Sequence, residues 1–103
     1  MRYHLAAIQE ICTAMAASKL DAAASVTESR LGMSLWRSHA AHEVSKFMPR
    51  GMQDAGTTMH RSASRFAVEA QNAGATGDMK PALKALGETL SACVGCHAGY
   101  RQK

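Results

Sequence analysis

The sequence predicts an all-α protein, an antiparallel four-helix bundle formed by one domain over residues 1–103. Apolar residues recur at steps of three and four along most of the chain, as on helices that bury one face. No stretch alternates β-branched or aromatic residues with polar ones, as strands do. The connections between the helical stretches are short, which favours antiparallel neighbours. A chain of 103 residues, 47% of them hydrophobic, is long enough for one core.

Two helices are expected in the first third of the chain. The first covers about residues 2–19. Its apolar stripe consists of Leu5, Ile8, Cys12 and Met15. The second starts with Asp21 as its N-cap and is stopped by Gly32 in the left-handed conformation. Residues 33–50 then form a connection with partial helix, interrupted by Pro49.

Two longer helices are expected in the second half. The third covers about residues 51–73, and a turn through Gly77 leads to the fourth. Asp78 is the predicted N-cap of the fourth helix, Pro81 is tolerated in its first turn, and the helix continues to about Arg101. The stripe of the third helix is Met52, Ala55, Met59, Ser62, Phe66, Ala70 and Ala73. The inward stripe of the fourth is Leu83, Leu86, Leu90, Cys93 and His97.

Charge and hydropathy exclude several classes of function. The net charge of +4 is spread along the chain without a block of like charge, so we expect no nucleic-acid partner. No run approaches the roughly 18 apolar residues of a membrane span. Three cysteines are too few, and odd in number, for a disulfide scaffold. Only five residues are aromatic, so either a bulky guest or close alanine packing has to fill the bundle.

The strongest chemical pattern is Cys93-Val94-Gly95-Cys96-His97, the Cys-x-x-Cys-His pattern of c-type haem attachment. Residues three apart on a helix share a face, so both thiols can reach the vinyl groups at one porphyrin edge. His97 follows directly and can bind the iron from the same side. The pattern therefore predicts haem c bound near the C-terminus, held by Cys93, Cys96 and His97.

Two other chemistries use similar residues. A thioredoxin-like dithiol places Cys-x-x-Cys at a helix N-terminus after a strand, whereas this pair comes late in the last helix. A structural zinc site needs four ligands, and the remaining candidate pair, His39 and His42, would leave His97 without a role. His39 and His42 are more simply a polar turn near the haem edge or exposed residues.

Residues 90–101 resemble the C-terminal end of the class II cytochromes c, the cytochrome c prime family. That family is an antiparallel four-helix bundle with Tyr or Phe and then Arg at three and four residues after the haem-binding histidine, positions matched by Tyr100 and Arg101. The third helix is similar too, with bulky Met52, Met59 and Phe66 before an alanine-rich end. The resemblance also implies a homodimer formed through the first two helices.

The resemblance implies that the distal side of the haem faces the first helix. A Met of that helix binds iron in one branch of the family, and an apolar residue leaves the iron five-coordinate in the other. Met1 is the expected distal ligand and His4, one turn on, is a weaker candidate. Met15 and Met59 are expected to pack. Separately, a haem propionate could pair with Arg101 or with Arg2, since either guanidinium would serve.

Two further polar or reactive residues have simpler interpretations. Cys12 is expected to be a small buried hydrophobe. His60, beside Arg61, is expected on the solvated outer face of the third helix.

Two functions follow from this chemistry. A Met opposite His97 would raise the reduction potential and suit a one-electron carrier that meets redox partner proteins. A vacant apolar distal face would instead bind small gases such as NO or CO. No acid–base pair is predicted over the iron, so we expect no enzyme activity. Haem c is attached outside the bacterial cytoplasm, which predicts a periplasmic location, and residues 1–8 lack the apolar run of a signal peptide, as in a processed chain.

Overall fold

The computed structural model describes residues 2–33 and 46–100. Over these residues the chain forms four helices and no strand: α1 (Arg2–Ala16), α2 (Leu20–Arg30), α5 (Arg50–Thr76) and α6 (Lys80–Tyr100). The predicted all-α bundle is therefore confirmed. None of the helices in the described segments is long and apolar enough to cross a membrane.

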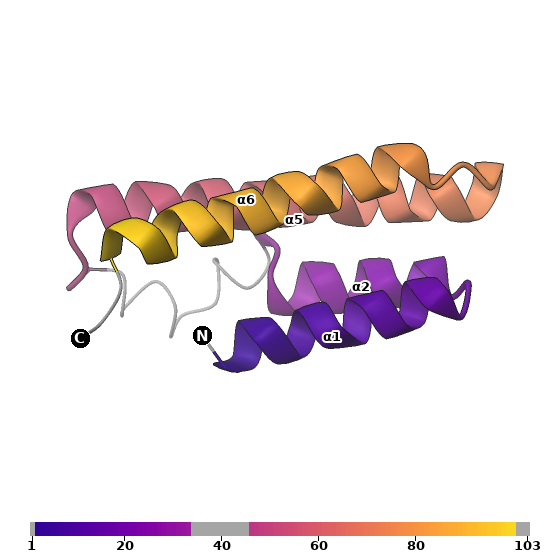
Figure 1. Ribbon diagram of the computed structural model, residues 1–103, viewed down its shortest axis with the longest axis horizontal. Coiled ribbons are helices and arrows are strands. Elements are labelled where there is room, and N and C mark those ends of the chain that lie inside the picture. The colour runs from indigo at the N-terminus through magenta and orange to yellow at the C-terminus, as the bar shows by residue number, and fades with distance from the viewer. Residues whose placement is uncertain (1, 34–45, 101–103) are drawn as a thin grey trace.

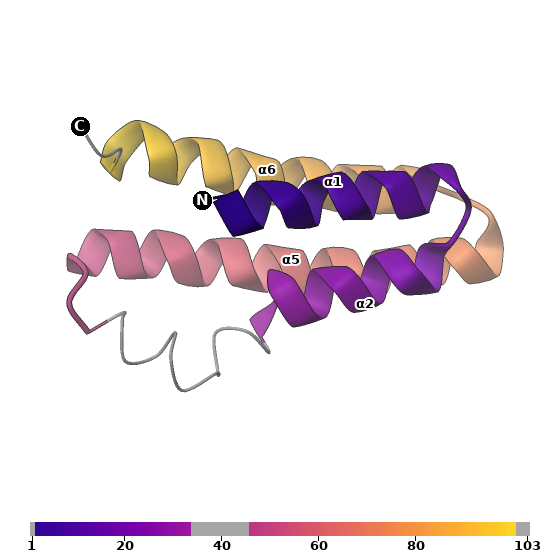
Figure 2. The ribbon, with the colours of Figure 1, turned by 90° about the horizontal axis from the view of Figure 1, so that it is seen from below.

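The helices are arranged as two antiparallel pairs, α1 with α2 and α5 with α6, stacked on each other (Figures 1 and 2). Extensive contacts join α1 to α2, α2 to α5, and α5 to α6, whereas α1 and α6 have at most marginal contact. The helix backbones thus lie close together on three sides of the bundle and further apart on the fourth, between α1 and α6. The start of α1 and the end of α6 lie at the same end of the molecule (Figure 1).

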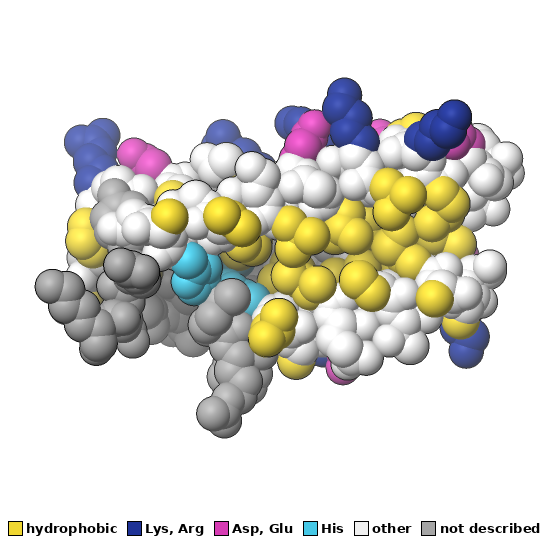
Figure 3. Space-filling model, viewed as in Figure 1, with side chains coloured by type: hydrophobic (Ala, Val, Ile, Leu, Met, Phe, Trp, Pro, Cys, Tyr) yellow, Lys and Arg dark blue, Asp and Glu magenta, His cyan; other side chains and the backbone are white. Residues whose placement is uncertain are grey.

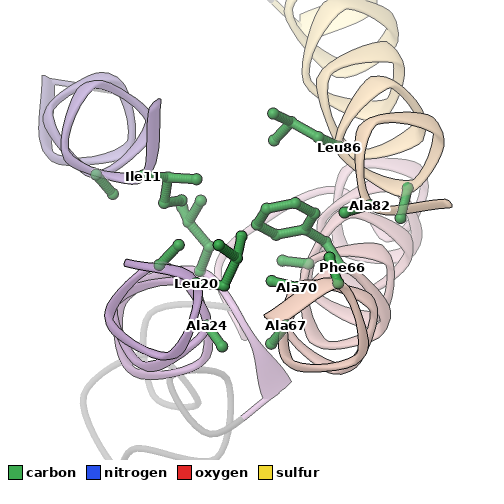
Figure 4. Close-up of a cluster of buried hydrophobic side chains, with 14 residues drawn as sticks. Ile11, Leu20, Ala24, Phe66, Ala67, Ala70, Ala82 and Leu86 are labelled. Atoms are coloured by element: carbon green, nitrogen blue, oxygen red, sulfur yellow. The ribbon is translucent and has the colours of Figure 1, made fainter. Parts of the chain in front are cut away.

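Alanine and one central aromatic ring build the core. Phe66 of α5 is fully buried and points between the helices, with Ile11, Leu20 and Leu86 around it from α1, α2 and α6 (Figure 4). Alanines make up most of the remaining core: Ala7, Ala23, Ala24, Ala63, Ala67, Ala70, Ala73, Ala82 and Ala85. Small side chains let helix backbones approach closely, so the few large groups noted in the composition are sufficient here. The predicted stripe on α5 is confirmed at Met59, Phe66, Ala70 and Ala73, which are buried.

Two predicted boundaries of α2 are wrong. The helix starts at Leu20, and Lys19 occupies the N-cap position without a side-chain hydrogen bond. Asp21 lies inside the first turn, where its negative charge is favourable near the positive end of the helix dipole. Gly32 does not adopt the left-handed conformation, because α2 already ends at Arg30.

Gly32 instead makes room for a contact between α2 and α5. A Cβ atom at this position would clash with the Glu28 carboxylate and the Ser64 hydroxyl. The Ser64 hydroxyl donates to Glu28 Oε2 at 2.7 Å and accepts from the Met33 backbone N–H at 2.8 Å. These bonds tie the end of α2 to α5 at a point where a side chain would not fit.

Helix α5 is longer than the pattern predicts and ends at a left-handed glycine. It continues to Thr76, and Gly77 (φ 81°) donates its N–H to the Ala73 carbonyl at 2.8 Å. Gly74 stays within the helix, where a Cβ would lie 3.3 Å from the Cβ of Leu20. Asp78 lies one residue before the N-cap position of α6, which is Met79, but its Oδ1 accepts the Lys80 N–H at 3.1 Å and so caps the start of the helix as predicted.

The predicted inward stripes of α1 and α6 are displaced by about one residue at most positions, although Leu86 is buried as predicted. The buried positions are Ala7 and Ile11 on α1, and Ala82, Ala85, Leu86 and Thr89 on α6. One residue corresponds to a rotation of about 100° around a helix. Leu5 (62% exposed), Leu83 (56%) and Leu90 (37%) are exposed, and so is Cys12, contrary to the expectation that it is buried.

The predicted stripes nevertheless describe a real feature. Hydrophobic side chains gather over α1 and α6 on the face where these helices stay apart (Figure 3). We call this side of the bundle the α1–α6 seam. By helical periodicity it comprises Leu5, Ile8 and Cys12 of α1, and Leu83, Leu90, Cys93 and His97 of α6, and it is bordered by the partly buried Met15 and the buried Leu86. Each terminal helix thus buries alanines together with one large side chain, Ile11 on α1 and Leu86 on α6, and leaves Leu5, Leu83 and Leu90 exposed.

The core assignment makes a direct prediction for stability. Phe66→Ala should lower the free energy of unfolding by about 3–5 kcal/mol, because it leaves a cavity in the centre of the bundle. Val68→Ala, at an exposed position of the same helix, should change it by no more than about 0.5 kcal/mol. Urea denaturation of both variants measures the difference, and equal effects would contradict the assigned core.

Candidate functional site

The Cys-x-x-Cys-His residues lie on the last turns of α6, which remains helical to Tyr100. Cys93 and Cys96 are both half-buried and unpaired, and His97 is exposed. The helical register is the one that haem attachment requires: the cysteines are three residues apart and His97 is four after Cys93. The expected inward position of His97 is wrong, since α6 turns its alanine face towards α5. His97 is accessible on the seam side instead.

The environment of Cys93 keeps its thiol protonated. Burial raises the pKa of Cys93, and the neighbouring Cys96 raises it further, although a backbone hydrogen bond opposes them. A thioredoxin-type nucleophile needs the opposite, a thiol whose pKa is depressed at a helix N-terminus. This geometry therefore disfavours a thiol–disulfide exchange site.

A cluster of histidines lies at the same end of the bundle (Figure 3). His60 of α5 is buried, with 7% of its surface exposed, and its Nδ1–H donates to the Leu31 carbonyl. The expectation of a solvated His60 is therefore wrong, because the alanine-rich packing of α2 on α5 encloses it. The ring of His4 packs edge to face on His60, with the centroids 6.2 Å apart and the planes at 85°.

The electrostatic environment of His4 includes both His60 and His97. Burial lowers the pKa of His4, and positive charge on His60 or His97 lowers it further. His4 is therefore a neutral imidazole at pH 7, able to offer a lone pair. The sequence pattern suggested His4 only as a weak candidate and gave no signal for His60, since neither residue belongs to a motif.

Other predicted residues divide into two groups. Met59 is buried and Met15 is partly buried against the core, which confirms that both pack. Four lie outside the described residues: Met1, His39, His42 and Arg101.

The described side chains do not form an alternative metal centre. Within residues 2–33 and 46–100, no three His, Cys, Asp or Glu side chains converge in a way that could hold a metal ion. Cys93, Cys96 and His97 lie along one helix and point from it at different angles, which does not make a tetrahedral set on their own.

A recess of the described surface lies elsewhere, between α2 and α5. It has a volume of about 630 Å³ and is lined mainly by polar side chains, among them Asp21, Glu28, Ser64 and Gln71. No residue of the Cys-x-x-Cys-His pattern lines it. Its carboxylates and hydroxyls do not suit an apolar macrocycle.

The part of the α1–α6 seam next to Cys93 does suit an apolar macrocycle. Leu5 of α1 and Leu90 and Val94 of α6 are large apolar side chains left exposed at or beside the seam. Fully covering such a side chain is favourable by about 1.5–3 kcal/mol. A flat apolar group attached at Cys93 and Cys96 would gain this stabilisation between the two helices that make little contact with each other.

Comparisons with protein-family models, with curated proteins and with solved structures find no match to this chain. Its function is therefore inferred from the chemistry of its own residues.

The state of the thiols can be measured directly in chain produced without haem. Iodoacetamide at pH 8 should modify exposed Cys12 several-fold faster than Cys93, because Cys93 is half-buried and its pKa is raised. Peptide mass mapping over time gives the rate at each cysteine, and Cys12→Ser should remove the fast phase. Faster labelling of Cys93 than of Cys12 would indicate an activated thiol and contradict this description of the site.

Proposed function

We propose that this protein is a c-type cytochrome that carries one haem c and transfers single electrons in the periplasm. The observation that carries the proposal is the placement of Cys93, Cys96 and His97 on one stretch of α6, beside the apolar α1–α6 seam. A dithiol enzyme needs an activated thiol, and zinc needs further ligands. The haem interpretation accounts for both half-buried cysteines, for the histidine and for the exposed leucines.

Covalent attachment of haem would require two addition reactions, one at each cysteine, and neither reaction needs an oxidant. Each thiol of Cys93 and Cys96 adds across a vinyl group of the porphyrin, its sulfur bonding to one vinyl carbon and its hydrogen going to the other. The two thioethers then fix the ring relative to α6.

The remaining residues hold and shield the ring. His97 would bind the iron as the proximal ligand. Leu5, Leu90 and Val94 would exclude water from its faces and lower the local dielectric constant, which tunes the reduction potential. Arg101 could pair with a propionate through charge-assisted hydrogen bonds. Bound haem c supplies the chemistry, a reversible change between Fe(II) and Fe(III).

The expected partners follow from this chemistry. A one-electron carrier exchanges electrons with redox proteins that present a haem or another one-electron centre. Haem c is attached outside the bacterial cytoplasm, which supports a periplasmic location. The homodimer implied by the resemblance to class II cytochromes c belongs to the same proposal.

A second candidate function is gas binding. Leu5 is apolar, largely exposed and located on the first helix, where an apolar residue facing the haem would leave the iron five-coordinate. Such a protein would bind NO or CO instead of serving as a carrier. If Met1 instead bound the iron opposite His97, the electron-carrier function would be favoured.

Covalent attachment can be tested residue by residue. In chain exported by a host that attaches haem c, the denatured protein should show the mass of polypeptide plus one haem and a single free thiol, that of Cys12. Cys93→Ala or Cys96→Ala should leave one thioether, and the double variant none. Cys12→Ala is the control and should keep the haem. A denatured wild-type chain with three free thiols would contradict the proposal.

The carrier and the gas binder differ in coordination number. For a carrier we expect a six-coordinate, low-spin optical spectrum in both oxidation states and slow, weak binding of CO to the reduced protein. Broad high-spin bands together with rapid CO binding would instead support the gas-binding function. Optical spectroscopy before and after CO addition gives the answer.

A further inference from the structure

We infer that His4 is the second protein ligand of the haem iron, so that the haem is held between the imidazoles of His97 on α6 and His4 on α1. This inference rests on the proposed function and specifies its distal site. It also favours the electron carrier over the gas binder, because an iron with two imidazole ligands has no free position.

The position of His4 follows from the topology. Helices α1 and α6 run antiparallel, so the start of α1 lies at the same end of the bundle as the end of α6 (Figures 1 and 2). His4 is in the first turn of α1, and His97 is in the last turns of α6. The seam between these helices is the side of the bundle with the least helix contact.

The orientation of His4 also fits a ligand. Its side chain is half-buried, and its ring packs edge to face on the ring of His60. His60 is itself buried and bonded to the Leu31 carbonyl, so it forms a fixed wall on the α5 side. The ring of His4 is thus turned towards the buried His60 and not outwards to solvent.

Other described side chains with a ligating atom are less well placed. Met15 is eleven residues further along α1, about 16 Å from His4, and packs against the core. Cys12 is about 12 Å along the same helix and is exposed. Met59 is buried in the α5 face of the core. Met15 and Cys12 therefore lie two turns or more from His4 along α1, and Met59 is enclosed in the protein interior.

Two imidazole ligands should give the iron a lower reduction potential than one imidazole and one Met ligand. A thioether stabilises the reduced iron and raises the reduction potential, whereas a second imidazole lacks that effect. The potential should therefore be lower than that of the Met-ligated form of the same protein. His4→Met provides that comparison within one chain.

The experiment uses the haem-loaded wild type and three variants: His4→Ala, His4→Met and Gln9→Ala. Near-infrared magnetic circular dichroism of the oxidised wild type should show the charge-transfer band of two imidazole ligands. His4→Ala should lose the low-spin spectrum and bind CO rapidly. His4→Met should remain low-spin, gain a sulfur-to-iron band and show a higher potential. Gln9→Ala, at an exposed position of α1, should match the wild type.

The outcomes separate the inference from the proposed function. A wild-type band typical of one imidazole and one thioether, lost in Met1→Leu and kept in His4→Ala, would overturn the inference and assign the position to Met1. A high-spin wild type would overturn it in favour of a vacant site. In both cases covalently bound haem would still support the proposed cytochrome function. Only a chain without haem would refute both that function and the assignment of His4. The wild-type spectrum alone identifies the type of the second iron ligand, even if the His4→Ala variant does not fold.

Discussion

The structure depends on how the two terminal helices pack. Helices α1 and α6 bury alanines against α2 and α5, with Phe66 as the one large ring in the centre. Alanine faces bring helix axes close together, but they leave the larger side chains of the same helices without a partner. Leu5, Leu83 and Leu90 are exposed for this reason. A bundle packed on three sides and apolar on the fourth is the arrangement from which the site follows.

This arrangement gives the Cys-x-x-Cys-His residues a suitable setting. The end of α6 carries two half-buried thiols and an accessible imidazole next to exposed apolar side chains, and the start of α1 brings His4 to the same end. Thioether attachment needs two reduced cysteines on one helical face, and a macrocycle needs an apolar surface on either side. Both requirements are met by residues from α1 and α6. The proposed haem would thus complete the side of the bundle that the polypeptide leaves open.

Much of the fold was predictable from periodicity, but the faces of the terminal helices were not. Large residues at steps of three and four identified the stripes on α1 and α6, yet the buried residues are one position away because alanine, not leucine, packs against α2 and α5. His60 was assigned to solvent because it adjoins Arg61, although its burial depends on where α2 ends. Gly32 looked like a helix stop and is instead a point of close approach to Ser64. The Cys93–His97 pattern needed no tertiary information, since its chemistry depends on spacing alone.

Extraction with acidified butanone tests the central claim most directly, because it removes haem bound only through the iron and leaves haem joined by thioethers. After export in a host that attaches haem c, the red colour should stay with the precipitated polypeptide and give the alkaline pyridine spectrum typical of saturated vinyl groups. Colour that passes into the organic phase, or a mature protein with no haem at all, would contradict the account.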